Sequence, residues 1–188
     1  MPFDVQQFRA SLIDDGARAA LFDISMNMPP APGITPLTSA AINFKARSSS
    51  LPGDSISSIT VPYFGREIKV AGTRTFPDWS FTVINDEDFL IRNNLELWMS
   101  ALNAHVGNVR NPALATMATY QADAIVTQYA KTGDIIKQYK MIGCFPTDVA
   151  AIDLDWASGD LIEEFGVTFA YQWWESAYPV QTTDISGA

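Results

Sequence analysis

The residue types that most often carry out chemistry in proteins are sparse in this chain. His105 is the only histidine and Cys144 the only cysteine among 188 residues. A Ser-His-Asp triad could therefore be built in one way only, and no Gly-x-Ser-x-Gly turn is present to carry its nucleophile. A lone cysteine forms neither an internal disulfide nor a cysteine metal cluster. We expect His105 to be solvated in a loop and Cys144 to be a small buried apolar side chain. No catalytic residue, metal or cofactor is predicted.

The densest group of carboxylates lies between Asp153 and Glu164. Its acids at the first, third and twelfth places are similar to those of a calcium-binding loop. The fifth place is Ala157, however, and the glycine comes one place late, at Gly159. No helices are predicted on either side. The alternation of acidic and apolar residues over 152–156 instead predicts a strand with one wet face, whose carboxylates would face a lumen or a subunit seam.

A shorter acidic run over residues 86–88 precedes the one long helical pattern in the chain. An apolar residue recurs there at i, i+4, i+7 and i+11, at Ile91, Leu95, Trp98 and Leu102. This stripe predicts a helix over about residues 87–103 that packs on a sheet. Acidic residues are favoured at a helix N-terminus because of its free N–H groups and its dipole. The run therefore needs no catalytic pair of carboxylates to explain it.

Length and charge bound the class of protein. The chain has 12 basic and 21 acidic side chains and a formal charge of −9. A surface that grips DNA needs clustered Lys and Arg, and no basic stripe is present. An acidic wall could still guide DNA by repelling it. The length fits one domain. No apolar run approaches a membrane span and no signal-peptide pattern is present, so we expect no membrane anchor and assembly in a cytoplasm.

Most of the remaining chain alternates apolar and polar residues with a period of two, which is typical of strands. We expect strands within residues 18–26, 41–47, 59–63, 66–70, 79–83, 121–130, 134–143, 152–156 and 165–173. A short helix is expected within 3–15, a proline-rich loop over 28–36, a hairpin turn at Gly133-Asp134, and a long polar loop over 104–119. The prediction is a mainly β protein, a sandwich or barrel-like pair of sheets with one packed helix. It would be a single domain with an N-terminal helix or arm (1–16), a β core (17–175) and a C-terminal arm (176–188).

The aromatic side chains could form a stacking platform for single-stranded nucleic acid, but such platforms combine aromatics with a basic groove. Here the aromatics alternate in phase with other apolar residues, which indicates a core. Trp173 and Trp174 differ from the others because neighbouring residues of a strand point to opposite faces. One of the two must face away from the subunit's core unless the strand is covered on both sides, so Trp174 is a candidate intersubunit or structural residue.

Two blocks of the sequence resemble the tail tube proteins of contractile-tailed bacteriophages. The first comprises Lys69 to Phe76, Asp78-Trp79 and Val83 to Glu87; the second comprises Ile142 to Val149, Leu154-Asp155-Trp156 and Phe165 to Phe169. With the Leu51-Pro52-Gly53 turn, the resemblance covers roughly residues 17 to 175.

In that family, six subunits form a ring whose inner sheets make a continuous barrel, and rings stack into a tube inside the sheath. The resemblance implies a non-enzymatic virion protein that conducts DNA without binding it specifically. It implies as partners other copies of the chain, the tail sheath, the baseplate or tube initiator, the tape measure protein and the tail terminator. A closed ring would also pair the strand edges that a sandwich exposes.

The resemblance suggests structural roles for individual residues. Gly72 would permit a tight turn, and Trp79 and Trp98 would lock strand and helix together. Arg74 would form an intersubunit ion pair with Asp78 or Asp155, or would be a solvated turn residue. Ring-to-ring contacts are expected at residues 51–59, beginning with Leu51, Pro52, Gly53 and Asp54, at 104–119 and at both chain ends.

Three alternatives stay open from the sequence. The chain could form the inner tube of a phage-derived contractile injection system that carries protein cargo. It could be a tube initiator of the same fold, which forms one ring. It could also be a monomeric β-sandwich enzyme or binding module. The absence of convergent His, Cys or Gly-rich motifs argues against this last alternative.

Overall fold

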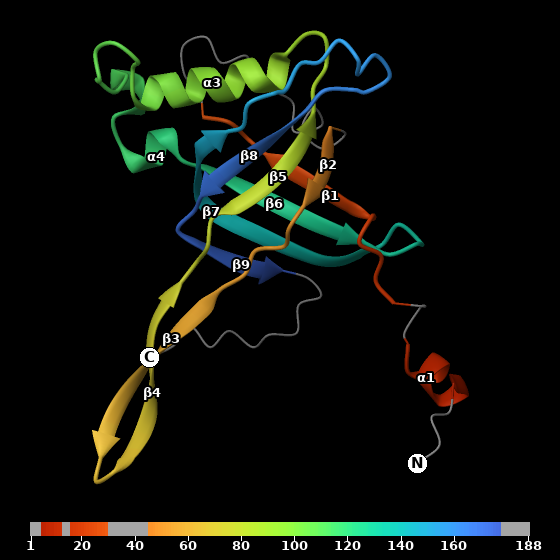
Figure 1. The fold of residues 1–188 in the computed structure, drawn as a ribbon, viewed down its shortest axis with the longest axis vertical. Coiled ribbons are helices and arrows are strands. Elements are labelled where there is room, and N and C mark those ends of the chain that lie inside the picture. Colours follow the sequence, from red (N-terminus) through yellow and green to blue (C-terminus); the bar gives the residue numbers. More distant parts are fainter. Residues whose placement is uncertain (1–4, 13–15, 30–44, 178–188) are drawn as a thin grey trace.

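The computed structural model describes residues 5–12, 16–29 and 45–177, and shows a mainly β body from which a two-stranded hairpin projects (Figure 1). Its helices are α1 (Val5–Ser11), α3 (Leu90–Leu102), the 3-10 turn η2 (Pro112–Leu114) and α4 (Met117–Tyr120). Its strands are β1 (Phe22–Met26), β2 (Ala46–Ser49), β3 (Ser55–Tyr63), β4 (Arg66–Thr75), β5 (Trp79–Ile84), β6 (Ala122–Tyr129), β7 (Ile135–Val149), β8 (Glu164–Ala170) and β9 (Trp173–Ala177).

The body consists of two antiparallel layers that share one long strand. One layer has the order β1-β6-β7-β9 and the other has the order β7-β8-β5-β2. The first half of β7 pairs with β6 and β9, and its last residues pair with β8. Gly143 lies between these halves with a φ of 71°. A Cβ at Gly143 would come within 2.9 Å of two glutamine side chains, so a glycine is needed where the strand passes between layers.

The core lies between the layers and is closed at one end by α3. Trp79 and Phe81 of β5 pack with Phe169 of β8, and the Phe81 and Phe169 rings stack with centroids 5.7 Å apart. Helix α3 buries Ile91, Leu95 and Trp98 against this cluster. The Trp98 indole donates a buried hydrogen bond to the Tyr120 carbonyl. The apolar stripe predicted from the sequence is therefore the packed face of α3.

Several predicted elements agree with the structure. Helices lie within both predicted ranges, and the Asp88 carboxylate accepts a hydrogen bond from the Leu90 N–H at the start of α3. The turn at Gly133-Asp134 joins β6 to β7. Strand β2 lies partly in the predicted range 41–47, although residues 41–44 are outside the described part. The proline-rich loop and the C-terminal arm fall mainly outside it as well.

Some of the predicted elements differ from the structure. Residues 152–156 do not form a strand: the chain turns there, and Leu154 and Trp156 are exposed. The alternation of acidic and apolar residues predicted a strand here, but a strand forms only where a neighbouring strand pairs with it, and none of the described strands pairs with this segment. The expected strand over 165–173 is divided, since β8 ends at Ala170 and β9 belongs to the other layer. The predicted polar loop over 104–119 also contains η2 and the start of α4.

Neither a metal cluster nor a membrane-spanning helix is found in the part of the chain that the structure describes. Within residues 5–12, 16–29 and 45–177, no three His, Cys, Asp or Glu side chains are grouped so that they could hold a metal ion. None of the described helices is long and apolar enough to cross a membrane.

Candidate assembly interface: the projecting hairpin and its base

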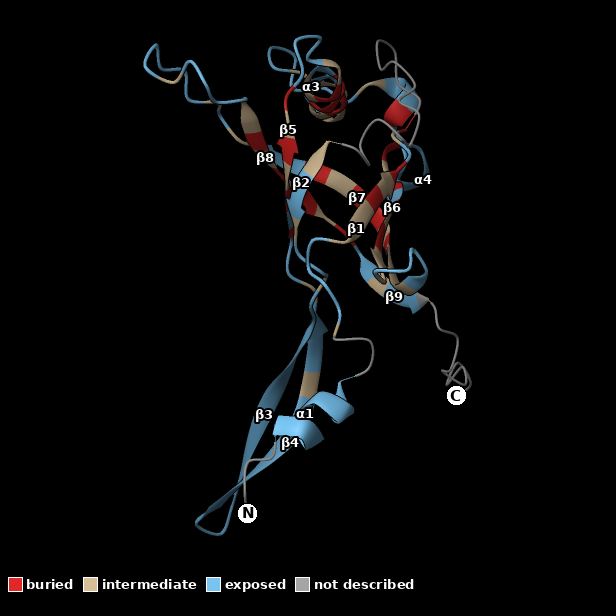
Figure 2. Ribbon diagram, turned by 90° about the vertical axis from the view of Figure 1, so that its right-hand side faces the viewer, coloured by how far each residue is buried: buried red, intermediate tan, exposed pale blue. Residues whose placement is uncertain are grey.

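The hairpin formed by β3 and β4 leaves the body and is exposed along its length (Figure 2). The sequence predicted strands here with one buried face. The strands are present, but neither face is buried within the subunit. An isolated two-stranded hairpin is only marginally stable in water. A contact with another molecule would supply the missing cover.

The two faces of the hairpin differ in chemistry, as its register shows. Ile59 lies opposite Val70, Val61 opposite Ile68, and Tyr63 opposite Arg66. Because directly opposed residues share a face, five apolar side chains lie together on one side. The five, which are Ile59, Val61, Tyr63, Ile68 and Val70, are each 45% to 61% exposed. We call this side the apolar face. The other side carries Thr60, Pro62, Glu67 and Lys69.

The tip of the hairpin presents another aromatic side chain. Phe64 is 95% exposed and has a φ of 42°, a conformation uncommon for a residue other than glycine. Its ring meets the Tyr63 ring edge to face, with centroids 4.8 Å apart. The two-residue turn of Phe64 and Gly65 requires a positive φ at both positions, and it leaves the Phe64 ring exposed at the tip, where another molecule could contact it.

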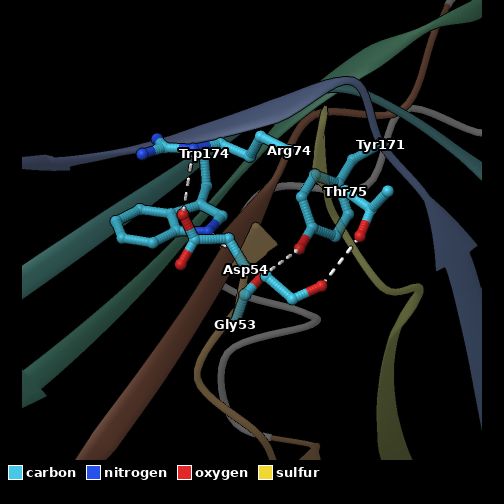
Figure 3. Close-up of polar contacts among 7 residues, drawn as sticks. Gly53, Asp54, Arg74, Thr75, Tyr171 and Trp174 are labelled. Carbon is cyan, nitrogen blue, oxygen red and sulfur yellow. Dashed lines mark hydrogen bonds and ion pairs between the residues drawn. The ribbon is translucent and has the colours of Figure 1, made fainter. Parts of the chain in front are cut away.

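The base of the hairpin is fastened to the body through the Gly53 carbonyl (Figure 3). The Tyr171 hydroxyl and the Trp174 indole each donate a hydrogen bond to this oxygen, both at 3.3 Å. Arg74 pairs with Asp54 across the two strands at 3.5 Å. The Ser55 and Thr75 hydroxyls, 2.8 Å apart, join the strands at the same level. We call this group of contacts the latch.

The segment that leads into the latch is also held. The buried Trp79 indole donates to the Ser50 carbonyl, 2.9 Å away, and approaches the Ser49 hydroxyl. Burial, and next the neighbouring Cys144, Asp54 and Asp78, raise the pKa of Tyr171 above its usual value. Tyr171 thus keeps its proton and remains a donor at neutral pH. These contacts fix the direction in which the hairpin leaves the body.

Gly72 has a different role from the one predicted. It lies within β4 and makes no tight turn, because the strand continues from Arg66 to Thr75. The register shifts opposite this point, between Ile56 and Ser58. A Cβ at Gly72 would meet the Ser57 hydroxyl at 2.5 Å and the Ser57 carbonyl at 3.0 Å. The glycine is therefore needed for the close approach of the two strands.

Among the described residues, no ion pair joins Arg74 to Asp78 or Asp155 within one subunit. Arg74 meets Asp54, while Asp78 and Asp155 are exposed elsewhere. The Asp155 carboxylate accepts the Ala157 N–H in its own turn. An intersubunit pair to Arg74 stays a prediction, and it would compete with Asp54.

The tryptophans occupy distinct positions. Trp79 and Trp98 are buried and both contact Phe169, at 5.9 and 6.0 Å between ring centroids. Trp174 packs edge to face on Tyr139 and reaches the latch. The sequence singled out Trp174 through its neighbour Trp173 but did not indicate its partner. It also missed Tyr171, whose alternation with other apolar residues indicated only a core position.

The residues suited to chemistry are dispersed. His105 is exposed in the turn after α3. Cys144 is fully buried, and burial raises the pKa of its thiol to about 12, so it is protonated and unreactive at neutral pH. The site that the geometry supports is a surface for protein contacts.

Comparison with known proteins agrees with this interpretation. The family model described as phage tail tube protein matches residues 17–177. The chain belongs to the phage tail tube protein family. Tail tube protein gp19 of Enterobacteria phage T4 is 35% identical over 133 residues, which cover 70% of this chain and 80% of the relative. The tail tube protein of Serratia phage KSP90 is 25% identical over 126 residues, which cover 67% of this chain and 70% of that relative.

Solved structures with the same fold come from contractile injection systems. The structure of a PVC sheath-tube complex in the extended state matches with a TM-score of 0.57 at 13% identity, over 93% of this chain and 98% of that one. The tube-terminating cap of the anti-feeding prophage matches with a TM-score of 0.60 at 14% identity, over 88% and 93%. This tail tube protein is thus a structural virion component of a contractile tail. Its family and its mainly β fold confirm the expectations from the sequence.

Proposed function

We propose that this tail tube protein forms six-membered rings that stack into a tube, through which DNA leaves the virion. The hairpin carries the proposal: its apolar face is built on paired strands, is held in a set direction by the latch, and is left uncovered by its own subunit. Half-exposed Val, Ile and Tyr side chains would each gain roughly 1 kcal/mol on full burial. Five of them would contribute about 5 kcal/mol to each hairpin contact.

Ring closure is supported by the edges of the layer β1-β6-β7-β9. In the described part of the chain, β1 and β9 are its outer strands. Their outer backbone N–H and C=O groups could pair with the corresponding edge of a neighbour, so that six layers make one barrel.

The side of that layer that faces away from the core, which we call the open face, would then line the channel. The register places Asp23, Asp123, Lys140 and Glu175 on the side facing away from the core. Of these, Asp23 is partly buried and accepts a hydrogen bond from the Tyr129 hydroxyl. Lys140 is neutralised by Asp123, 2.9 Å away, which also raises the pKa of the lysine. The remaining charge of this face is negative. Such a wall repels phosphates and lets DNA pass without adhering.

The same fold in injection systems raises the possibility of protein cargo. The sequence relatives at 25% to 35% identity are tail tube proteins of phages, which favours DNA as the cargo.

The neighbouring structures include a sheath-tube complex, a terminator and a baseplate. We therefore propose the sheath, the baseplate or tube initiator, the tape measure protein and the tail terminator as partners. Family membership removes the alternative of a monomeric enzyme or binding module.

The lumen proposal is tested by reversing the charge of the open face. Glu175→Lys should leave tubes assembled but slow DNA ejection, because a cation on the wall would hold the phosphates. Asp134→Lys in the β6–β7 turn is a control with a similar charge change. Unchanged ejection through tubes of the Glu175→Lys variant would contradict the proposed wall.

A further inference from the structure

The loop between β7 and β8 carries a second exposed apolar surface. Leu154, Trp156, Leu161 and Ile162 are between 71% and 104% exposed. Residues 151–162 contain three acids, Asp153, Asp155 and Asp160, and no Lys or Arg. We call this segment the acidic loop. Four large apolar side chains in twelve residues are more than a solvated loop needs, and such patches mark contact sites.

The acidic loop is held in a defined shape. The Asp155 carboxylate and carbonyl accept the N–H groups of Ala157 and Ser158, both at 3.0 Å. At its end, the Asn85 side chain donates to Glu163 at 2.9 Å. The loop thus presents its apolar side chains from a turn that is anchored to the body.

The acidic loop and the hairpin lie at opposite ends of the subunit. Both views place the β7–β8 connection at the same end of the molecule as α3, away from the β3–β4 hairpin (Figures 1 and 2). They cannot meet within one subunit. A hairpin of one copy can reach the acidic loop of another when the copies follow head to tail, the kind of contact that generates stacks.

The two surfaces are complementary in chemistry. Residues 55–75 of the hairpin contain three cations, Arg66, Lys69 and Arg74, against one acid, Glu67. Of these, Arg74 is already paired in the latch. Arg66 lies opposite Tyr63 on the apolar face, whereas Lys69 lies on the other side. Arg66 is therefore the cation that can meet the acids of the loop while the apolar face meets its apolar side chains. Opposite charges around an apolar contact favour this partner and set its register.

We propose that the acidic loop is the surface that receives the hairpin of a subunit in the adjacent ring. The inference rests on the proposed stacking of rings and identifies the contact that holds two rings together. The occupant is a second copy of this chain, because one chain carries both complementary surfaces. A sheath protein on the acidic loop is the competing outcome of the test.

Cross-linking between variants that each carry one added cysteine tests the contact. Cys144 is buried, so the wild-type chain serves as the unreactive background. Phe64→Cys at the hairpin tip and Ala157→Cys in the acidic loop, mixed and assembled, should give a covalent dimer with a short flexible bismaleimide. Each variant alone should give at least about tenfold less dimer. Thr132→Cys in the β6–β7 turn replaces Ala157→Cys as the control and should not cross-link.

Charge reversal adds a second readout in the same cysteine background. Asp153→Lys/Asp160→Lys in the loop should lower the cross-link yield at least about tenfold, equivalent to losing 1.4 kcal/mol. Arg66→Glu in the hairpin should also lower the yield, and combining it with the loop variant should restore part of it.

The outcomes separate this inference from the proposed function. Tubes that form without the hairpin-to-loop cross-link, or that protect the acidic loop only when the sheath is added, overturn the inference and leave the tube proposal standing. An absence of rings and tubes from the wild-type chain, with or without a tail baseplate, contradicts the proposed function itself.

Discussion

Replacing two opposed residues of the apolar face should abolish tube growth without weakening the subunit. Val61 and Ile68 are paired across β3 and β4 and are 45% and 48% exposed. Val61→Thr/Ile68→Thr keeps β-branched side chains, which suit strands, but adds two hydroxyl groups. The hairpin itself should therefore still form.

The magnitude follows from burial in the contact. A hydroxyl buried without a hydrogen-bond partner costs about 1–3 kcal/mol. Two such groups would cost each hairpin contact about 2–6 kcal/mol, which lowers its association constant at least about 30-fold. The cost recurs at every copy around a ring. Subunit stability should change by no more than about 0.5 kcal/mol, because both positions are half exposed.

The assay combines sedimentation with electron microscopy over a range of concentrations, and urea unfolding of the unassembled subunit. Thr60→Ala/Glu67→Ala changes the opposite face of the hairpin and is the matched control, expected to assemble normally. Tubes of the threonine variant that form at the wild-type concentration would refute the role of the apolar face. A large loss of subunit stability would instead show that the face is covered within the subunit.

Three further results are expected from the isolated subunit. Trp98→Ala should lower the free energy of unfolding by about 3–5 kcal/mol because the side chain is fully buried, whereas Trp156→Ala at an exposed site should change it by less than about 0.5 kcal/mol; equal effects in urea unfolding would contradict the packing described. Tyr171→Phe should cost about 0.5–1.5 kcal/mol and speed amide exchange in the hairpin, since one donor to Gly53 is lost; unchanged exchange would show that the latch does not hold the hairpin. The Cys144 thiol has a pKa raised by burial from 9.0 to about 12, so the unfolded chain releases this proton first and stability should fall between those pH values. Cys144→Ala should make that fall shallower by up to about 1.4 kcal/mol per pH unit, and identical slopes would count against a buried thiol.

The sequence predicted what local patterns determine. The stripe of Ile91, Leu95 and Trp98 identified α3 because an apolar stripe three turns long indicates a helix that packs on a sheet. Most strands were predicted from alternation. Alternation does not say what covers the apolar side, however, and so the hairpin was expected to be buried like the rest.

Features that depend on the neighbours of a segment could not be predicted. Residues 152–156 alternate as a strand does, yet no strand lies beside them. Gly72 was predicted to form a turn because glycine is common in turns. The structure shows instead that a glycine is required at this position because Ser57 on the opposite strand leaves no room for a side chain. Tyr171 joins the latch through a carbonyl more than a hundred residues away, a contact without any local pattern.

The central claim is that this tail tube protein closes into six-membered rings that stack through the hairpin. A cryo-electron microscopy reconstruction of tubes grown from the purified protein, on tail baseplates if needed, tests it most directly. The account predicts six subunits around an open channel lined by the layer β1-β6-β7-β9, with each hairpin's apolar face buried on a subunit of the next ring. Tubes in which the hairpin points into solvent, or monomers that never polymerise on a baseplate, would contradict it.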